Sequence, residues 1–600
     1  MKNELIKSLK KAGQKAGISA DLLKELALEY PENPDHGDFS SNIAMAHAKG
    51  LKVAPKVLAD KIIDQFKKEM PDFVESVGVA GPGFINFKIK DKFFAESVIT
   101  PKDLIAKSLT TKKQIMVEYT DPNPFKIFHI GHLMSNAIGE SISRLIESDG
   151  TEVVRTCYQG DVGLHVAKTI WGIKNVPNID FDSLKDKGII AKLNVLGMAY
   201  VAGSAKYESD TFYDHIFDDV APNKNQIEIK REIDLINKQI FEKSDKEINK
   251  IYDLGRKWSL EYFDTIYARL GTKFNSFFFE SEMAPIGVEI VKKFSKDGLF
   301  RKQVFTESEG ATVFKGEDYG LHTRVFITSQ GLPTYETKEL GLNTNKFNKY
   351  PNLDQSVIIT ANEQNDYFKV VLKAFSLINP KIYEKTKHIS HGLLRFASGK
   401  MSSRKGHVIS AEDLINEIKS LVMERIAGKE FAVDEAQEIA DIIAIGAIKY
   451  TILRQAIGGD VIFDSAKSIS FEGDSGPYLQ YSAVRANSIL EKAKKEGIRI
   501  NDQVSINNNQ VKLPEKVGLL EKLIIRFPDV VERASAEYAP QLVANYLINL
   551  AGAFNSFYAG NTIVDVNEPL SSYRIELTKI FVETMEKGLH ILGIKIPKRM

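Results

Sequence analysis

The hydrophobic and polar positions change their pattern twice along the chain and divide it into three predicted domains. Residues 1–105 are lysine-rich and close on VGVAGPGFINFKI, a strand-like segment that glycine and proline interrupt. Residues 106–410 mix strand-like runs, such as TRVFITSQ and SVIITANEQ, with helical segments. Residues 411–600 are helical almost throughout, beginning with SAEDLINEIKSLVMERI, in which Ser410 and Asp413 form a capping pattern.

The start of the second domain has the pattern of a strand–loop–helix–strand unit. QIMVEYT is a strand-like run, a proline-containing loop follows, and GHLMSNAIGESISRLIESDG is helical up to Gly150. The helix has one apolar face, made of Leu133, Ala137, Ile138, Ile142 and Leu145. TEVVRTCY then predicts a second strand. Because such strands are normally parallel, we predict an α/β domain with a parallel sheet, and the charged helical stretch at about 180–285 is best explained as an insertion.

Composition limits the class of protein without deciding its partner. With 43% hydrophobic and 26% charged residues, the chain is typical of globular proteins. No run is long enough to span a bilayer, and the N-terminus lacks the apolar region of a signal peptide. The single cysteine, Cys157, excludes a disulfide framework and a multi-cysteine zinc site, and it predicts a reducing intracellular compartment. A net charge of +1 does not predict a nucleic-acid partner, but it permits local basic surfaces.

Two histidines three residues apart, His129 and His132, lie in VEYTDPNPFKIFHIGHLMSN, where the loop becomes the helix. They fall on one face of the first helical turn, where free backbone N–H groups and the helix dipole favour an anion. Gly131 lets a phosphate approach the backbone closely, and Lys126 adds a positive charge. The pattern predicts a nucleotide phosphate site at the carboxyl end of a strand, although buried packing histidines have the same sequence signature.

A second candidate site is the segment FASGKMSSRKGHVIS, residues 396–410. Gly399 and Gly406 frame a loop that holds Lys400, Arg404, Lys405 and two serines. Taken alone, this composition is more typical of a solvated basic loop than of a binding site.

Together, H-I-G-H and the later K-M-S-S-R resemble the two signatures of class I aminoacyl-tRNA synthetases. VEYTDPNPFKIFHIGHL, with its Pro-Asn and a lysine just before the histidines, is similar to the arginyl-tRNA synthetase form of the first signature. YPENPDHGDFSSNIAMAHAK and VAGPGFINF resemble the N-terminal domain of that family, and FEGDSGPYLQYSAVRANSIL and the final LGIKIPKRM resemble its anticodon-binding domain. The resemblance covers the whole chain. It implies an N-terminal α+β domain that contacts the tRNA elbow, a Rossmann-type catalytic domain, and an all-α anticodon-binding bundle.

The resemblance implies an arginine–tRNA ligase that works in two steps. The carboxylate of arginine attacks the α-phosphate of ATP, which gives arginyl-adenylate and pyrophosphate, and the 2′-OH of the terminal adenosine of tRNA-Arg then takes the arginyl group. The implied catalytic residues are His129, His132, Lys126 and Lys400, and the implied ATP-binding residues are Gly131, Met401, Ser402, Ser403 and Arg404.

One position departs from the usual K-M-S-K-S signature, because Ser403 replaces its second lysine. The resemblance implies that Lys126 supplies the missing charge, with Arg404 or Lys405 as further contributors. Mg²⁺ is implied only as the ion that ATP carries, and the sequence shows no dedicated metal site.

The implied arginine pocket consists of Glu118, Asn123, Tyr335, Glu339 and Gln364. Anions and planar acceptors suit a guanidinium group, which offers five donors in a fixed fork. Because the ammonium group of lysine cannot satisfy acceptors spaced for that fork, the pocket is expected to reject lysine. Glu339 stands where the family usually has Asp, and Lys338 where it usually has Arg, which leaves the detailed geometry of the pocket open.

The implied anticodon-binding residues are Tyr478, Tyr481, Arg485 and Met600. The first three share a face of a helix that begins at Pro477, and their rings can stack on unpaired bases or pack between helices. The resemblance further implies a cytoplasmic monomer without a membrane contact. Two other interpretations stay open: a class I enzyme of another specificity, such as a cysteinyl or glutamyl relative, and a non-catalytic paralogue that binds tRNA or protein partners.

Overall fold

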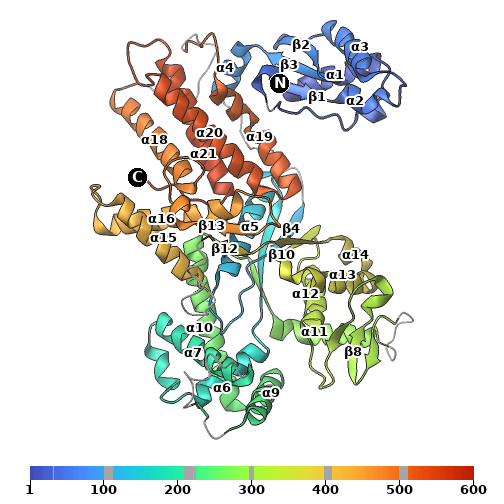
Figure 1. Ribbon diagram of the computed structural model, residues 1–600, viewed down its shortest axis with the longest axis vertical. Coiled ribbons are helices and arrows are strands. Elements are labelled where there is room, and N and C mark those ends of the chain that lie inside the picture. The colour runs from blue at the N-terminus through green and yellow to red at the C-terminus, as the bar shows by residue number, and fades with distance from the viewer. Residues whose placement is uncertain are drawn as a thin grey trace. The chain divides into compact units, whose positions relative to one another are not determined.

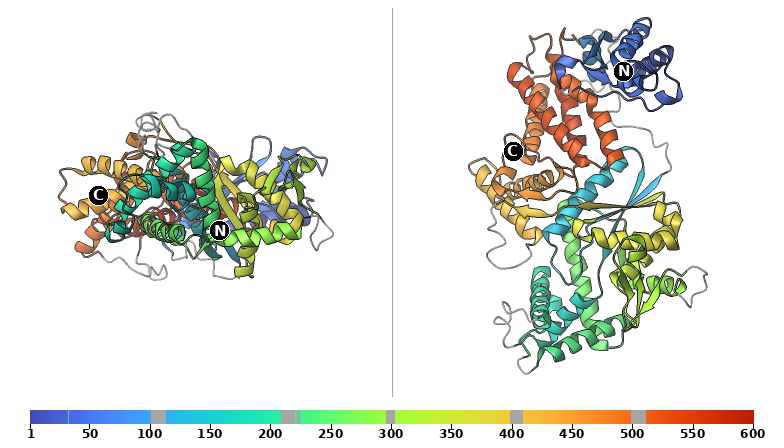
Figure 2. Two further views of the ribbon diagram at one scale, coloured as in Figure 1. Left: turned by 90° about the horizontal axis from the view of Figure 1, so that it is seen from below. Right: turned by 45° about the vertical axis from the view of Figure 1, so that its right-hand side comes forward.

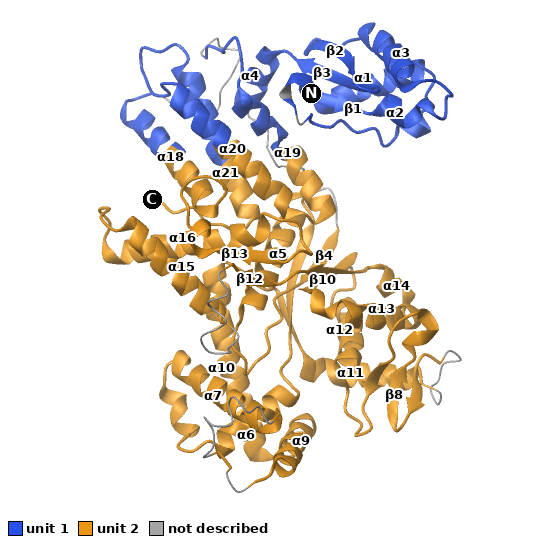
Figure 3. Cartoon of the chain, in the orientation of Figure 1, with its two compact units in different colours: residues 1–102, 486–527, 552–583 blue, residues 103–485, 528–551, 584–600 orange. Residues whose placement is uncertain are grey.

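The computed structural model describes residues 1–31, 33–100, 113–208, 220–221, 224–295, 303–397, 409–498 and 511–600. The chain divides into two compact units (Figure 3), of which the first contains residues 1–102, 486–527 and 552–583, and the second contains residues 103–485, 528–551 and 584–600. Among the described residues, no helix combines the length and the apolar character that crossing a membrane requires.

The N-terminal part of the first unit combines a small sheet with helices. The sheet is antiparallel, with the order β1-β3-β2, and its strands are β1 (Phe39–Ser41), β3 (Phe84–Ile89) and β2 (Val74–Ala80). The helices that share its core are α1 (Lys2–Lys15), α2 (Ile43–Ala48) and α3 (Pro55–Lys67), and α4 (Asp91–Ile99) follows. Helix α1 buries Leu5 and Leu9, four residues apart, and leaves most of its lysines outside. The expected α+β fold is confirmed.

The second unit is built on a five-stranded parallel sheet with the order β11-β10-β4-β5-β6. Figure 1 labels two of its neighbouring strands, β10 and β4. Its strands are β11 (Thr386–His391), β10 (Gln355–Ala361), β4 (Gln114–Glu118), β5 (Glu152–Gln159) and β6 (Ser276–Phe279). From β4 the chain moves first to β5 and β6 on one side and later to β10 and β11 on the other. Strand β4 is therefore next to the point where the strand order reverses, which is where open α/β sheets bind their ligands.

Helix α5 (Ile130–Ser148) joins β4 to β5, as the sequence predicts, and Gly150 follows its end with a φ of +81°. The five apolar residues of the predicted face are buried. The helix is, however, buried on nearly all sides, because polar residues such as Asn136, Ser141 and Ser143 are buried as well.

Helices also fill the connection between β5 and β6. They are α6 (Leu164–Asn175), α7 (Ile189–Glu208), α9 (Gln226–Glu242) and α10 (Lys246–Leu270). The charged helix α9 begins with a capping box between Asn225 and Glu228 and buries an isoleucine at almost every turn. These helices enclose a core of their own around Trp171 and Trp258.

A second, smaller sheet lies after β6 in the chain. It is antiparallel and consists of β7 (Thr306–Ser308), β8 (Ala311–Phe314) and β9 (Arg324–Ile327), so that TRVFITSQ supplies β9 here while SVIITANEQ supplies β10 of the parallel sheet. The accompanying helices are α11 (Glu280–Lys293), α12 (Tyr335–Lys349), α13 (Asn365–Ile378) and α14 (Pro380–Glu384). Helices α11 and α12 meet closely, because a Cβ at Gly287 would lie 1.9 Å from the Thr337 carbonyl oxygen.

The last part of the chain is helical, as expected, and both further views show its long helices (Figure 2). The helices are α15 (Ala411–Ile426), α16 (Val433–Leu453), α18 (Gly476–Lys495), α19 (Leu519–Glu537), α20 (Pro540–Gly560) and α21 (Ser571–Ile591). The hydroxyl of Ser410 accepts a hydrogen bond from the Asp413 N–H at 2.9 Å, which confirms the predicted cap of α15. One short strand, β13 (Val461–Phe463), interrupts the helices and pairs in parallel with β12 (Leu394–Phe396).

Candidate active site

Strand β4 ends with Glu118, whose side chain is almost completely buried beside Lys346 of α12. Their relative exposures are 2% and 0%, and Glu118 Oε2 lies 2.8 Å from Lys346 Nζ. The two groups are close enough for an ion pair, but their geometry is not that of a hydrogen bond. Among the described residues, neither Glu118 Oε2 nor Lys346 Nζ has a hydrogen-bond partner. A buried charged group without hydrogen bonds is costly. A polar ligand that forms hydrogen bonds with Glu118 and Lys346 would therefore bind favourably at this end of the sheet.

Three more carboxyl groups surround this pair. Burial, and then the charge of Glu118, raise the pKa of Glu339 on α12 to about 8. The same two causes raise the pKa of Asp121 well above its usual value. Glu280, the first residue of α11, is buried against the ammonium of Lys338, and burial raises its pKa too.

Three buried carboxyl groups and the half-buried Asp121 thus lie near two lysines, and burial, followed for Glu339 and Asp121 by the charge of Glu118, raises the pKa of three of the four carboxyl groups. The hydroxyl of Tyr158, whose pKa is raised first by burial and then by Glu280 and Glu339, is also buried without a hydrogen-bond partner among the described residues. Acceptors of this kind fit a ligand that has a positive charge and several N–H donors, which is the chemistry of a guanidinium group.

Asn123 approaches this cluster through a gap that a glycine provides. A Cβ at Gly160, directly after β5, would lie 2.2 Å from Asn123 Oδ1 and 3.2 Å from Glu280 Oε1. The loop that carries Asn123 is strained, because Thr120, Asp121 and Phe125 have φ values of +82°, +45° and +67°. Strain of this kind persists only where the surroundings hold the backbone, and it often marks a binding site.

The two other predicted pocket residues lie nearer to solvent. Tyr335 begins α12 and is 57% exposed, and the Lys338 ammonium lies 4.2 Å from its ring centroid. Tyr335 and Glu339 are one turn apart, as predicted, but only Glu339 is buried. Gln364 is exposed between β10 and α13, and it makes no hydrogen bond to the other predicted pocket residues that the structure describes.

His129 and His132 cap the N-terminus of α5. His129 Nδ1 accepts a hydrogen bond from the Gly131 N–H at 3.1 Å, and His132 Nδ1 accepts one from the His129 N–H at 3.2 Å. The rings stack with centroids 3.6 Å apart. A Cβ at Gly131 would lie 3.0 Å from the His129 ring, so the glycine allows this ring to fold back over the turn.

These contacts fix both the charge and the tautomer of the two rings. Burial, followed by the charge of Lys126, lowers the pKa of His129 to about 4, and burial lowers that of His132 well below its usual value. Both imidazoles are therefore neutral near pH 7. Because each Nδ1 accepts a hydrogen bond, the proton is on Nε2, and each ring presents one N–H donor.

Lys400, Met401, Ser402, Ser403 and Arg404, which form the second signature, lie outside the described residues. The segment from Ile409 to Ala411, a few residues further along the chain, pairs with the histidine turn: the Ile130 N–H donates to the Ile409 carbonyl at 3.2 Å, and the Ala411 N–H donates to the Phe128 carbonyl at 2.8 Å. Two segments that are far apart in the sequence therefore meet at the N-terminus of α5. Lys126, which precedes the histidines, lies 5.3 Å from the ring centroid of Tyr200.

The predicted anticodon residues lie on α18 and at the chain end. Tyr478, Tyr481 and Arg485 are all half-buried. The Arg485 guanidinium lies 4.7 Å from the Tyr481 ring centroid and donates to the Tyr481 hydroxyl at 3.1 Å. Met600 is half-buried and follows Arg599, which pairs with Glu435 at 2.5 Å.

Several residues of the site were not predicted from the sequence. The pocket also contains Asp121, Tyr158, Glu280 and Lys346. Asp161 stabilises the pocket through its hydrogen bonds to Ser281, the residue after Glu280. Asp161 is fully buried, and its carboxylate accepts hydrogen bonds from Arg256, Tyr252 and both the N–H and the hydroxyl of Ser281, at 2.7–3.1 Å. Polar residues directly after strands β4 and β5 were the available signal. The described residues contain no group of three or more His, Cys, Asp or Glu that could hold a metal ion.

Comparisons with known proteins agree with this arrangement. The family model for the catalytic domain of class I tRNA synthetases (R) matches residues 95–465, the model for the arginyl-tRNA synthetase N-terminal domain matches residues 2–89, and the DALR anticodon-binding domain matches residues 479–600.

Individual proteins match over nearly the whole chain. The arginine–tRNA ligases of Clostridium perfringens and Fusobacterium nucleatum are each 30% identical to this chain, over 590 and 582 residues, and each alignment covers 96% of both sequences. The structure of the Thermus thermophilus arginyl-tRNA synthetase has the same fold, with a TM-score of 0.77 and 22% identity over 100% of both chains. The chain belongs to the class I arginyl-tRNA synthetase family.

Proposed function

We propose that this chain activates L-arginine with ATP and transfers the arginyl group to the 2′-OH of the terminal adenosine of tRNA-Arg. The observation that carries the proposal is the excess of buried carboxyl groups around Glu118, next to a helix N-terminus that presents two neutral histidine donors. The first feature suits a guanidinium group and the second suits a phosphate.

In the first step, the guanidinium group of arginine binds among Glu118, Glu339 and the Tyr335 ring, while Asn123 and Gln364 supply amide groups. Its positive charge compensates the carboxyl excess that raises the pKa of Glu339. Lysine is rejected because its compact ammonium leaves some of these buried acceptors unpaired.

The arginine carboxylate then attacks the α-phosphorus of ATP, and pyrophosphate leaves. His129 and His132 donate from Nε2 to phosphate oxygens as negative charge builds on them, and neutral donors already fixed by their caps need no reorganisation. Lys126 adds charge beside them. Lys400 stabilises the pyrophosphate, and Gly131, Met401, Ser402, Ser403 and Arg404 complete the ATP site. Mg²⁺ arrives with ATP and neutralises phosphate charge, and the described residues offer no separate metal cluster.

In the second step, the 2′-OH attacks the carbonyl carbon of arginyl-adenylate, and AMP leaves. Residues 1–105 contact the tRNA elbow, residues 106–410 carry the chemistry, and residues 411–600 bind the anticodon through Tyr478, Tyr481, Arg485 and Met600. The chain acts as a monomer in the cytoplasm. Tyr481 and Arg485 already stack on each other, and their half-exposed faces offer a surface for an unpaired base.

The test is ATP–pyrophosphate exchange with each of the twenty amino acids, with and without total tRNA. Exchange with arginine and with no other amino acid is expected. Exchange with a different amino acid would contradict the assignment of Glu118, Tyr335 and Glu339, and a folded protein that binds tRNA but exchanges nothing would be a non-catalytic paralogue. Tyr481→Ala should weaken tRNA-Arg binding by about tenfold without changing the KM for arginine, and an unchanged affinity would assign the ring to packing.

A further inference from the structure

The strained loop after β4 is held in place by helix α5. The Thr120 N–H donates to the Ser135 hydroxyl at 2.9 Å, and the Asn136 amide donates to the Thr120 hydroxyl at 3.1 Å. Tyr119, the residue between Glu118 and this loop, packs on α5 so closely that a Cβ at Gly139 would lie 2.2 Å from its ring. The position of Glu118 in the arginine pocket therefore depends on how α5 lies against β4.

A buried hydrogen-bond network continues from Tyr119 along α5. The Tyr119 hydroxyl donates to Glu140 at 2.6 Å, and Glu140 also accepts hydrogen bonds from Arg144 at 2.8 Å and from Arg155 at 3.3 Å. Burial acts to raise the pKa of Glu140, but Arg155 and Arg144 outweigh it and hold the pKa below its usual value. Glu140 therefore stays ionised and binds all three partners.

Arg144 extends this network to the last residues of α21. Its Nη1 donates to the His590 carbonyl at 2.7 Å and lies 3.4 Å from His590 Nδ1, and its Nη2 donates to the Gly271 carbonyl at 3.0 Å. Carbonyls at the ends of α21 and α10 thus meet a cation, which is the favourable partner for a helix C-terminus.

Lys449 of α16 binds neighbouring carbonyls of the same two segments. Its buried ammonium donates to the Leu270 carbonyl at 2.6 Å and to the Gly593 carbonyl at 2.8 Å. Gly593 has a φ of +67°, and a Cβ there would lie 2.9 Å from Lys449 Nζ. Two cations from α5 and α16 therefore hold the same two chain segments, residues 270–271 and 590–593.

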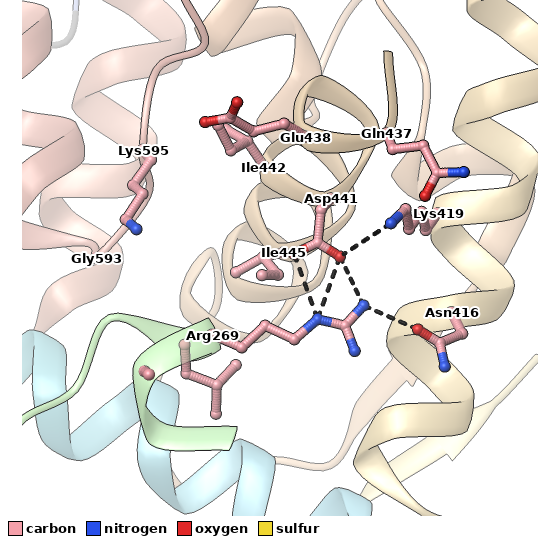
Figure 4. Close-up of a pocket in the computed structure, with 12 residues that line it drawn as sticks. Arg269, Asn416, Lys419, Gln437, Glu438, Asp441, Ile442, Ile445, Gly593 and Lys595 are labelled. Atoms are coloured by element: carbon pink, nitrogen blue, oxygen red, sulfur yellow. Dashed lines mark hydrogen bonds and ion pairs between the residues drawn. The ribbon is translucent and has the colours of Figure 1, made fainter. Parts of the chain in front are cut away.

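This junction borders a polar cavity of about 620 Å³. Figure 4 shows Arg269 reaching across it to Asp441 on α16 and Asn416 on α15, while Gly593 and Lys595 lie on the opposite side. Of the segment after α21, Gly593 and Lys595 line the cavity, whereas Ile591, Leu592 and Ile594 are buried. Hydrogen bonds from Arg144 and Lys449 hold the segment in addition to this packing.

We infer that Arg144 is a positioning residue for arginine binding. Through Glu140 and Tyr119, Arg144 fixes the position of the pocket residue Glu118 relative to the segment 590–593. The inference rests on the proposed function. The end of α21 belongs to the domain proposed to bind the anticodon. According to the inference, this end of α21 influences the position of Glu118 in the arginine pocket. The connection is contiguous: hydrogen bonds link the exposed His590 to Arg144, Arg144 to Glu140 and Glu140 to Tyr119, and Tyr119 follows Glu118 in the chain.

The test measures the KM for arginine and the KM for ATP separately, by pyrophosphate exchange with tRNA present. Arg144→Met is expected to raise the KM for arginine by about tenfold and to leave the KM for ATP within about twofold. Arg155→Met is the matched control, because Arg155 also binds Glu140, but its other hydrogen bonds go to Glu147 and not to residues 590–593. Its KM for arginine should change by less than about threefold.

Two further variants separate positioning from general destabilisation. Lys449→Met does not touch Glu140, yet it should also raise the KM for arginine, because Lys449 holds the same segment. Tyr119→Phe removes one hydroxyl, and its effect should not add to that of Arg144→Met in the double variant, since both break one network. Thermal unfolding of each variant shows whether it is folded.

Equal effects of Arg144→Met and Arg155→Met, an equal rise in the KM for ATP, additive effects in the double variant, or no effect of Lys449→Met would each overturn the inference. If Arg144→Met does not fold, Tyr119→Phe decides the question: a raised KM for arginine supports the inference and an unchanged one overturns it. Absence of exchange by the unchanged protein would instead contradict the proposed function.

Discussion

The arginine pocket and the histidine turn lie at the same end of the parallel sheet but treat charge in opposite ways. Around Glu118, carboxyl groups and lysines are buried together, and carboxyl groups are in excess. At the start of α5, burial lowers the pKa of two imidazoles until both are neutral, and the ammonium of Lys126 lies near them. Burial favours the neutral form of titratable groups in both regions, but the pocket also buries the Glu118–Lys346 and Glu280–Lys338 ion pairs, whereas the histidine turn presents two neutral rings.

The difference follows from what each region has to recognise. An enzyme selects one amino acid best with buried hydrogen-bond acceptors that other amino acids leave unpaired. Such selection needs charged side chains held at fixed positions in the pocket. A phosphate changes its charge distribution during the reaction, and it is served best by donors that are already oriented before the charge appears. Substitutions in the first region should therefore act on arginine, and substitutions in the second on the rate of activation.

The largest effect is expected for Glu118→Gln. Loss of this anion should lower kcat/KM for arginine by about 10⁴-fold and leave the KM for ATP within about threefold, because the pocket then lacks the charge that selects guanidinium. The variant also leaves Lys346 buried without a counter-ion, and the free energy of unfolding should fall by about 3 kcal/mol. Pyrophosphate exchange and denaturant unfolding measure the two effects.

Two controls sharpen this result. The double variant Glu118→Gln/Lys346→Met should recover stability but not arginine activation, because it removes the unpaired cation and not the missing anion. Glu282→Gln changes an exposed glutamate on the neighbouring helix α11 and should have no effect. A comparable loss of ATP affinity in Glu118→Gln would show that the two regions are not separable.

In the histidine turn, the comparison is between two amide substitutions of His132. An asparagine side chain at this position can reproduce the cap that Nδ1 makes, whereas the longer glutamine side chain can reach the position of Nε2. We expect His132→Asn to keep the stability of the protein but to lower kcat by roughly 10²–10³-fold, the typical cost of one lost donor, and His132→Gln to retain more activity. The KM for arginine should stay unchanged in both.

Much of this division was predictable from local sequence. His129 and His132 lie in a strand–loop–helix pattern that is clear in the sequence, and this pattern predicts a phosphate site at a strand end next to a helix N-terminus. The role of Glu118 was implied by the family resemblance. The capping of α15 by Ser410 and the end of α5 at Gly150 are predictable for the same reason, since both depend on a few neighbouring residues.

The remainder depends on contacts between distant segments. Lys346 is an ordinary helix lysine in the sequence, and only the placement of α12 beside β4 buries it against Glu118. Asp121, Tyr158 and Glu280 come from segments that the order β10-β4-β5-β6 brings together, and hydrophobic patterning does not specify strand order. For the same reason, the sequence did not predict that TRVFITSQ forms a strand of the separate antiparallel sheet.

A smaller effect is expected for Gly160→Ala, which tests whether Asn123 belongs to the charged region. The new Cβ would lie 2.2 Å from Asn123 Oδ1, and a side-chain end can move away from it at little cost to stability. A displaced Asn123 should nevertheless raise the KM for arginine by about 10²-fold, because small shifts of a positioning group are costly in a preorganised site. Gly188→Ala, which meets no atom within 4 Å, is the matched control. A KM within about twofold of normal would remove Asn123 from the pocket.

The mildest test uses pH and involves no substitution of the pocket. Burial and Glu118 raise the pKa of Glu339 to about 8 from an ordinary value of 4.5, so the folded protein keeps this proton between those two values. Stability should therefore decrease as the pH rises through that window, because the unfolded carboxyl is ionised there and the folded one is not. Guanidinium binding favours the ionised carboxylate.

The KM for arginine should consequently fall by about tenfold between about pH 7 and pH 9, as the ionised fraction of Glu339 rises. The KM for ATP should not follow, because His129, with a pKa of about 4, remains neutral throughout this range. In Glu339→Gln, the pH dependence should disappear while arginine binds more weakly at every pH. If the KM for arginine of the variant still depends on pH, Glu339 is not the titrating group. The group that loses its proton would then be Asp121 or Glu280.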